Sequence, residues 1–251
     1  MKLIILGTAA LSGQPYAGKT VSRKEARAII ERAAGEHKIT QYDTSPTYGF
    51  AEDVLGEVLS GHGITIYSKH AADASVLSSV KKLSRCTVKL LAHNLDPAIM
   101  NLLSGWQSMP KWADGYSAYA KDDKRVIHTW QMEYVRQFDC SIISRVAADS
   151  GIQFMARSIF ARGMLCGGTV PPEIAGAVKA AKEVAESLRL PLPALALHWA
   201  LQQPRITGVV IGPSSVAELD QIMAWAKLPC QDIGKLVNLI PSVALDPRTW
   251  N

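Results

Sequence analysis

Four residues of chemically useful types lie at or just beyond the ends of consecutive apolar runs. Asp43 ends one run, Lys69 ends the next and His93 ends the one after, while Tyr48 lies in the loop beyond Asp43. Carboxylate, ammonium, imidazole and phenol groups hold and move protons. Each residue alone has an ordinary explanation, such as packing for a tyrosine or solvation for a lysine. Because chance seldom supplies four such residues at successive run ends, we interpret them as one site for proton-transfer chemistry.

The residues that must position this site fall into eight short apolar runs, which we predict to be strands. They are Lys2–Leu6, Ile39–Asp43, Ile64–Lys69, Val88–His93, Ala113–Ser117, Thr129–Tyr134, Ile152–Ser158 and Thr207–Gly212. The first run also resembles a short secretory signal, but Gly7 and Thr8 interrupt it. No Gly-x-Gly-x-x-Gly follows that run, which disfavours an open dinucleotide-binding sheet.

Helix-like segments separate the runs, with apolar residues at helical spacing. They are Ser22–Ala34, Glu52–Leu59, Asp73–Leu83, Ser141–Asp149, Ile174–Leu188, Pro193–Gln203 and Val216–Ala226. Ser22 and Asp73 are plausible N-caps. Strands separated by helices pair in parallel through right-handed crossovers. We therefore expect an α/β fold in which residues 1–251 form a single-domain (β/α)8 TIM barrel, with the four polar residues at the C-terminal mouth of its strands.

The composition narrows the possible partners. No apolar run approaches the ~20 residues of a membrane span, and the four cysteines are scattered without metal-ligand spacing. We expect reduced thiols, a cytoplasmic location and no metal site. The net charge of +5 is dispersed over helix-like stretches such as Arg23–Arg27, which favours a solvated face over a nucleic-acid surface. A monomer or weak oligomer with a small-molecule substrate is the expectation.

The residues around the proposed site resemble those of the aldo-keto reductases. Residues 43–56, DTSPTYGFAEDVLG, follow the pattern D-T-A-x-x-Y-G-x-x-E-x-x-L-G, with Ser45 in place of the usual alanine. Further matches, in order, are Tyr67–Lys69 to the T-K at the third strand, Leu90–His93 to L-x-x-H, Gln131–Tyr134 to Q-x-E-Y and Arg162–Leu165 to G-R-G-L-L. The resemblance runs from about Leu3 to Ile222.

This resemblance implies reduction of an aldehyde or ketone to an alcohol by hydride transfer from NADPH, or alternatively from NADH. Tyr48 would be the general acid. A free phenol has a pKa near ~10, and an ammonium group beside a phenol makes it a stronger acid. Lys69 would supply that ammonium, Asp43 would hold Lys69 in place, and His93 would orient the substrate carbonyl.

The implied cofactor residues depart from the family pattern. They are Ser117 at the serine of the family's G-x-S-N, Gln131 at the carboxamide, Arg157 and Ser158 near the nicotinamide ring, and Gly212, Ser214, Ser215 and Glu218 at the pyrophosphate and adenosine end. Arg157 replaces an aromatic residue found in many relatives, Ala118 replaces an asparagine, and Ile222 replaces the asparagine that contacts adenine. No basic residue lies in the segment Gly212–Ser215 to bind a 2′-phosphate, so both NADPH and NADH remain candidate cofactors.

These departures keep a second function open, that of a catalytically weak, nicotinamide-binding regulatory module with the same fold. The sequence contains no motif of a sugar-phosphate isomerase, another kind of enzyme built on this barrel. The short tail Asp232–Asn251 suggests an open pocket. Tyr16, Trp112, Tyr119 and Phe160 could line that pocket, and Arg157 or Arg162 could attract an anionic substrate. Packing and solvation are the ordinary explanations for these residues.

Overall fold

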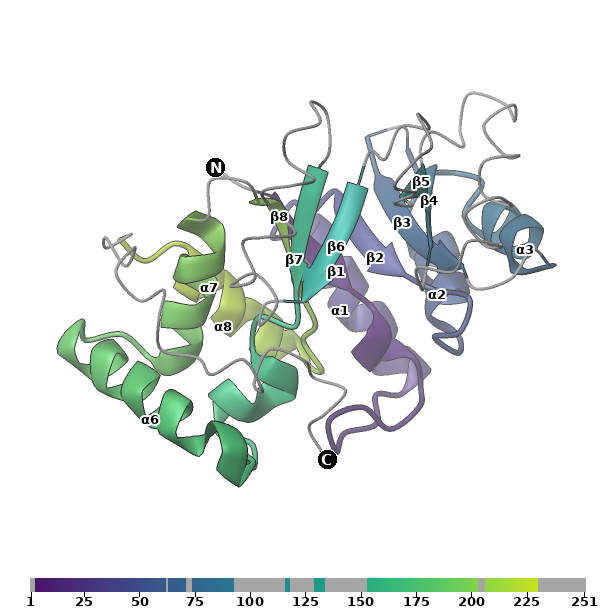
Figure 1. Ribbon diagram of the computed structural model, residues 1–251. Coiled ribbons are helices and arrows are strands. Elements are labelled where there is room, and N and C mark those ends of the chain that lie inside the picture. Colours follow the sequence, from purple (N-terminus) through teal and green to yellow (C-terminus); the bar gives the residue numbers. More distant parts are fainter. Residues whose placement is uncertain are drawn as a thin grey trace, which may run out of the picture.

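The computed structural model of the chain describes residues 3–61, 63–70, 74–92, 116–117, 129–133, 153–202 and 206–229. The predicted helix Ser141–Asp149 and the predicted site residue His93 lie outside these ranges. Within residues 3–92 and 153–229, strands and helices follow one another as expected from the sequence, while residues 116–117 and 129–133 are described as strands alone (Figure 1).

The strands form one parallel sheet in the order β5-β4-β3-β2-β1-β8-β7-β6. They are β1 (Leu3–Gly7), β2 (Gln41–Thr44), β3 (Thr65–His70), β4 (Thr87–Ala92), β5 (Tyr116–Ser117), β6 (Thr129–Glu133), β7 (Gln153–Arg157) and β8 (Ile206–Ile211). The sheet curls so that residues of its edge strands β5 and β6 approach within 8 Å between Cα atoms. The predicted (β/α)8 barrel class is therefore confirmed.

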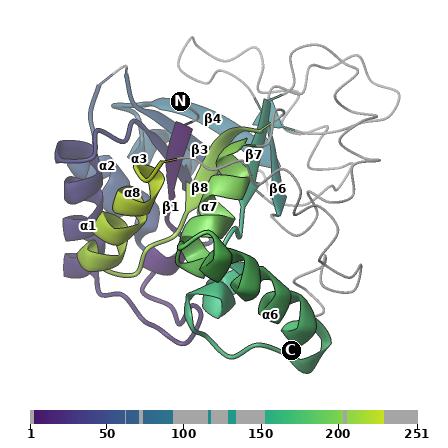
Figure 2. The ribbon, with the colours of Figure 1, turned by 90° about the vertical axis from the view of Figure 1, so that its left-hand side faces the viewer.

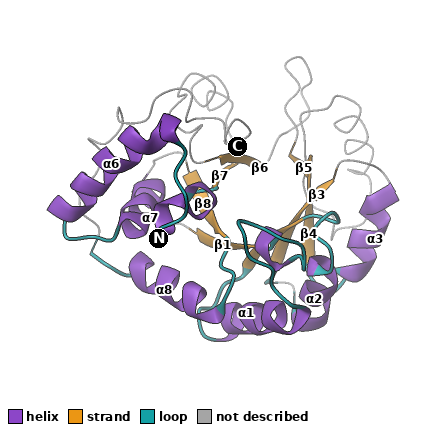
Figure 3. Ribbon diagram, turned by 90° about the horizontal axis from the view of Figure 1, so that it is seen from below, coloured by secondary structure: helices purple, strands orange, loops and turns teal. Residues whose placement is uncertain are grey.

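The helices lie outside this curled sheet (Figure 3). They are α1 (Arg23–Gly35), α2 (Ala51–Val58), α3 (Ala74–Lys82), α6 (Pro172–Ser187), α7 (Leu192–Gln202) and α8 (Val216–Ala226), with the 3-10 turns η1 (Ala9–Leu11) and η4 (Ala161–Cys166). Helix α1 packs against both α2 and α8, and Figure 2 shows α1 beside α8. The predicted N-cap is confirmed, because the Ser22 hydroxyl accepts a hydrogen bond from Glu25 N while the Glu25 carboxylate accepts one from Ser22 N.

Two layers of apolar side chains cover the two faces of the sheet. Leu6, Tyr42, Ile66 and Val209 belong to the larger outer core, between the strands and the helices. A smaller inner cluster fills the barrel and consists of Ile5, Tyr67, Leu91, Met155 and Val210. Both faces are buried, which explains why the strands read as continuous apolar runs in the sequence.

The inner cluster fixes which polar residues face the mouth. Side chains two residues apart lie on the same face of a strand. Lys69 follows Tyr67 by two residues, and Arg157 follows Met155 by two residues. Asp43 pairs in register with Tyr67 and with Gly7. These positions are on the inner face, near the C-terminal ends of their strands, where barrel enzymes place their active sites.

Candidate active site

Asp43 and Lys69 form a buried ion pair between the neighbouring strands β2 and β3. Lys69 Nζ donates to Asp43 Oδ1 over 2.5 Å, and the two residues are only 6 % and 5 % exposed. The backbone carbonyl of Asp43 accepts hydrogen bonds from Thr8 N and from Thr8 Oγ1. A buried charge requires a partner, so each member of the pair offsets the cost of burying the other and holds it in position.

Tyr48 lies directly beside this pair. Its ring centroid is 5.1 Å from Lys69 Nζ, and the side chain is half-buried. Tyr48 N donates to Ser45 O, and Tyr48 O accepts from Ala51 N at the start of α2. The structure thus brings together three of the four residues predicted from the sequence, with the ammonium between the carboxylate and the tyrosine.

The glycine after Tyr48 has a steric role. Gly49 has a φ of +49°, and a Cβ atom on it would lie 2.0 Å from the carbonyl oxygen of Ser12. The segment that joins β1 to α1 therefore rests on the turn that carries Tyr48. Only glycine allows this approach and this φ together, which accounts for the Tyr-Gly pair of the motif.

The remaining letters of the motif hold helix α2 in place. Glu52 is buried and accepts hydrogen bonds from Ser68 Oγ at 2.6 Å and from Ser79 Oγ at 2.7 Å, which links α2 to β3 and α3. Burial raises the pKa of Glu52, although the two serine hydrogen bonds act in the opposite direction. A Cβ atom on Gly56 would lie 2.2 Å from the carbonyl oxygen of Lys82. These contacts fix α2, and with it the turn that holds Tyr48.

Ser45, the one departure within the motif, also supports the site. Its hydroxyl donates to the carbonyl oxygen of Lys69 at 2.8 Å and shares a 2.9 Å hydrogen bond with Thr47 Oγ1. The side chain is fully buried. An alanine cannot make this bond, so in this chain a hydroxyl anchors the backbone of Lys69. The sequence shows the departure but not the partner.

A tight turn places Tyr16 over the same mouth. Tyr16 and Lys19 exchange two backbone hydrogen bonds, and the residues between them, Ala17 and Gly18, have φ values of 48° and 75°. This is the geometry of a two-residue hairpin turn with two left-handed residues. Tyr16 itself is 40 % exposed.

The pKa of the Tyr16 phenol depends on the charges around the mouth. Partial burial raises the pKa of Tyr16, and so does Tyr48, whereas the positive charges of Arg162, Arg157 and Lys69 lower it. The charges of the two arginines and of Lys69 therefore act on the same part of the site as the two tyrosines.

The adenosine end of the expected cofactor site is occupied by a side chain of the protein. Ser215 caps α8 by accepting from Glu218 N, as its predicted position before the helix implies. The Glu218 carboxylate accepts from Ser214 N and from Ser214 Oγ, each at 2.8 Å, and also pairs with Lys19. Partial burial acts to raise the pKa of Glu218, but the hydrogen bonds from Lys19 and Ser214 outweigh it and lower the pKa. 

The other predicted cofactor residues take the following places. Ser117 ends β5, Gln131 lies in β6, Arg157 ends β7, Ser158 follows β7 with a φ of 57°, and Gly212 follows β8. A Cβ atom on Gly212 would meet nothing within 4 Å. His93, Ala118, Trp112 and Tyr119 lie outside the described residues, and their predicted roles stay predictions.

Comparison with protein families decides the relationship. The profile of the Aldo/keto reductase family matches residues 3–93 and 106–240, which is most of the chain. The chain belongs to this family. As an aldo-keto reductase it is an oxidoreductase of the carbonyl-reducing type, and members of the family generally use NAD(P)H.

Solved structures show the same fold. Aldo-keto reductase AKR11C1 from Bacillus halodurans, in its holo form, has a TM-score of 0.71 and 17 % identity, over 95 % of this chain and 92 % of that one. The thermostable aldo-keto reductase Tm1743, in complex with the inhibitor epalrestat, has a TM-score of 0.70 and 18 % identity, over 94 % of each chain. Among curated proteins, a sequence search finds no match.

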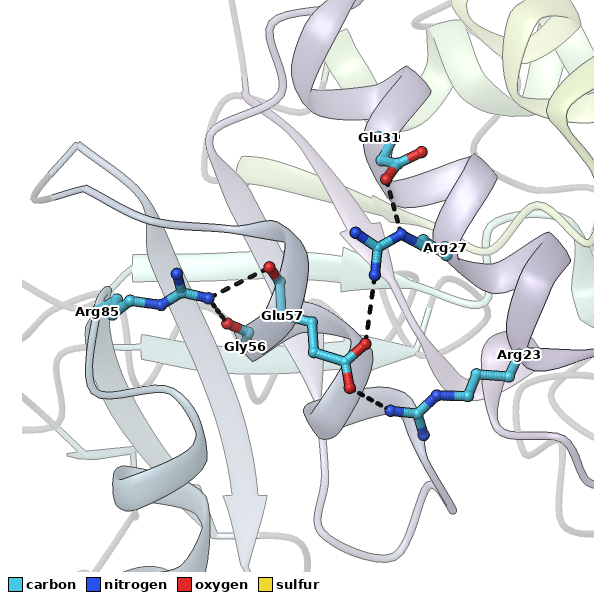
Figure 4. Close-up of polar contacts among 6 residues, drawn as sticks. All are labelled: Arg23, Arg27, Glu31, Gly56, Glu57 and Arg85. Carbon is cyan, nitrogen blue, oxygen red and sulfur yellow. Dashed lines mark hydrogen bonds and ion pairs between the residues drawn. The ribbon is translucent and has the colours of Figure 1, made fainter.

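On the outer surface of this aldo-keto reductase, glutamates pair with the arginines of the basic cluster at Arg23–Arg27. Arg23 and Arg27 on α1 both pair with Glu57 on α2, and Arg27 also pairs with Glu31 (Figure 4).

Among the described helices, none has both the length and the hydropathy to cross a membrane. The described side chains include no cluster of three or more His, Cys, Asp or Glu residues suited to a metal ion.

Proposed function

We propose that the protein reduces an aldehyde or ketone to an alcohol, with Tyr48 as the general acid. The observation that carries this proposal is the position of the Lys69 ammonium, between the Asp43 carboxylate and the ring of Tyr48. An ammonium beside a phenol stabilises the phenolate that remains after the proton has left. Asp43 holds that ammonium in place in a buried setting, where an unpaired charge would be costly.

The protein groups would act on the carbonyl oxygen. As negative charge develops on that oxygen, the Tyr48 hydroxyl donates its proton and Lys69 stabilises the resulting phenolate. His93, by the family resemblance, orients the carbonyl through a hydrogen bond. A bound NAD(P)H molecule supplies the hydride.

The residues at the mouth suit a nicotinamide dinucleotide in part. Gly212 leaves space beyond the end of β8, and Lys19 brings a positive charge to this end of the site through its ion pair with Glu218. Glu218 suits a 2′-hydroxyl better than a 2′-phosphate, because its carboxylate is ionised and already takes the hydrogen bonds of Ser214. NADPH stays the cofactor implied by the resemblance, and NADH is the alternative that Glu218 favours.

Cofactor oxidation by the purified protein tests the reductase. NADPH and NADH are each supplied with a panel of reactive aldehydes, and cofactor affinities are measured in parallel. We expect aldehyde-dependent consumption of at least one cofactor. Glu218→Gln should shift the ratio of the two dissociation constants toward NADPH by about tenfold, the effect of about one charged hydrogen bond. The control Glu183→Gln removes an equal charge from an exposed position on α6.

The second candidate is a regulatory module that binds the cofactor and turns over slowly. This module is favoured by the N-terminal end of α8, where the Glu218 carboxylate accepts the Ser214 hydrogen bonds that a cofactor could otherwise receive. One slow round of hydride transfer with the cofactor retained would support this module, whereas repeated rapid turnover supports the reductase. A folded protein that binds neither cofactor contradicts both.

A further inference from the structure

We propose that Ser45 is a positioning residue for the proton transfer, because it ties the turn that carries Tyr48 to the strand that carries Lys69. The inference rests on the proposed function and adds a residue to it. Ser45 stands where the family pattern usually has alanine, so the tie belongs to this chain's own sequence. It consists of two hydrogen bonds, one through the backbone of Ser45 and one through its side chain.

The backbone bond holds Tyr48 in a tight turn. Ser45 O accepts a hydrogen bond from Tyr48 N over 2.9 Å, which closes a turn of four residues. Serine is favoured at the first position of such a turn, and proline, here Pro46, at the second. The Ser45 hydroxyl also accepts a hydrogen bond from Thr47 N at 3.3 Å, the contact that serine makes with the residue two positions later. The first residue of the turn therefore fixes its shape.

The side-chain bond joins this turn to β3. The last residues of β2 and β3 that pair in register are Thr44 and Ser68. One residue further along both strands, Ser45 Oγ donates to Lys69 O over 2.8 Å. The side chain thus extends by one residue the connection that the backbone makes between the two strands. The carbonyl it binds belongs to the residue whose ammonium lies beside Tyr48.

The hydrogen bonds around the Ser45 hydroxyl have a fixed direction. A carbonyl oxygen only accepts, so the single proton of this hydroxyl goes to Lys69 O. The Thr47 hydroxyl, 2.9 Å away, then donates its own proton to Ser45 Oγ. Ser45 is fully buried, and polar groups that lose a partner in a buried setting pay the cost of desolvation. An alanine at this position therefore removes a bond that the surrounding groups are arranged to receive.

The placement of these two residues matters for the proposed chemistry. Lys69 Nζ is held by Asp43 and lies 5.1 Å from the centroid of the Tyr48 ring. The influence of an ammonium on a phenol falls with distance, and a displacement of about 1 Å at a reacting group can lower a rate by about 10²-fold. Ser45 reaches both partners through one hydrogen bond each. It acts through Tyr48 and Lys69 rather than as an acid or a base.

Ser45→Ala tests the positioning role. Alanine is smaller than serine and is the residue of the family pattern, so the variant should fold. We expect the single-turnover rate of hydride transfer to a reactive aldehyde to fall by about 3–10-fold, while the cofactor dissociation constant stays within about twofold of wild type. The alkaline fall of this rate should move to higher pH, because a less well placed ammonium stabilises the phenolate less. Asp43, Lys69 and Tyr16, the described titratable groups that act at Tyr48, are unchanged in the variant.

Tyr42→Phe is the matched control. Tyr42 is fully buried in the outer core, and its hydroxyl donates to Ile39 O over 2.8 Å. The control therefore removes a hydroxyl-to-carbonyl bond of the same length as the one that Ser45 makes with Lys69. Both variants should lower the midpoint of urea unfolding to a similar extent. Tyr42→Phe should nevertheless keep the wild-type rate and its pH profile.

A double variant shows whether Ser45 acts through Tyr48. In a Tyr48→Phe background the hydroxyl that Ser45 positions is already gone. We expect Ser45→Ala to change the residual rate in that background by less than about twofold. A full 3–10-fold loss there, of the size expected for a misplaced group, would mean that Ser45 acts on the site in another way and would overturn the proposal.

Two further results would overturn it. One is a folded Ser45→Ala variant that keeps the wild-type rate and pH profile. The other is a loss of rate that Tyr42→Phe shares, which would reflect a general loosening of the barrel. A wild-type protein that binds cofactor but reduces no aldehyde rejects the proposed function itself, and the role of Ser45 with it. If the wild type does reduce aldehydes, the reductase stands whatever Ser45→Ala shows.

Discussion

At the scale of single residues, the site depends on a buried pair of charges. Asp43 and Lys69 are each almost fully buried and are 2.5 Å apart. Burying a single charge costs several kcal/mol, and a close partner offsets this cost. The pair therefore contributes to both the stability of the barrel mouth and the placement of the ammonium beside Tyr48.

Removing one partner should be costly. Lys69→Met or Asp43→Asn each leaves the other side chain buried without its partner, and we expect each to lower the free energy of unfolding by about 3–5 kcal/mol. The double variant should lose at least about 1 kcal/mol less than the sum of the two. Urea unfolding measures all three. Lys82→Met, which breaks a pair with Asp53 whose two side chains are 37 % and 38 % exposed, should cost under ~1 kcal/mol. Additive losses would show that the pair is not coupled.

Gly49 shows how one hydrogen atom in place of a methyl group supports the site. In Gly49→Ala, the new Cβ atom would strike the carbonyl of Ser12. We expect a loss of more than ~2 kcal/mol in unfolding free energy and a fall in kcat, because the turn that carries Tyr48 must move. Gly18→Ala is the matched control, since Gly18 also has a left-handed φ but its Cβ would meet nothing within 4 Å. It should cost only about 1 kcal/mol. Equal effects of the two variants would contradict the steric role.

At the scale of elements, the site is held by contacts between segments that the sequence separates widely. Glu52 joins α2 to β3 and α3, Ser45 joins the end of β2 to the end of β3, and Lys19 joins the first loop to α8. Each contact places a polar group at a fixed position near a strand end. The mouth is thus positioned by the packing of neighbouring elements rather than by the Tyr48 loop alone.

The buried carboxyl group of Glu52 should make the stability of the native state depend on pH. Its pKa is raised by burial above the ordinary value of 4.5, so the native state holds its proton over a range in which the unfolded state has lost it. The native state is then favoured at low pH, and this contribution is lost as pH rises through the raised pKa. Glu52→Gln removes it. The stability of the variant relative to wild type should therefore improve from pH 4 to pH 7, as measured by urea unfolding.

The comparison needs an exposed reference. Glu57→Gln changes a residue whose side chain is 46 % exposed and should show little such trend. A variant whose relative stability falls with rising pH would mean that Glu52 is stabilised as an anion, which contradicts the direction of its pKa shift.

At the scale of the whole molecule, the parallel sheet with two buried faces explains why its strands could be predicted from the sequence. The short apolar runs placed the predicted strands within one residue of β1, β3 and β4, and the polar residues at or just beyond their ends predicted that Asp43, Tyr48 and Lys69 lie close together, as they do. Features that depend on the approach of distant segments were not visible. The contact of Gly49 with Ser12, the occupation of the α8 end by Glu218, and the left-handed turn at Arg162 all require the closed tertiary structure.

The most direct test of the account replaces Tyr48 by phenylalanine. The change removes one hydroxyl from a half-buried ring beside Lys69, and Tyr16→Phe removes the same group from a second tyrosine at the mouth. We predict that Tyr48→Phe lowers kcat by at least ~10²-fold, the usual contribution of a general acid, while the cofactor dissociation constant stays within about twofold. Tyr16→Phe should lower kcat by less than about tenfold. A Tyr48→Phe enzyme that keeps its kcat would contradict the assignment of Tyr48 as the proton donor.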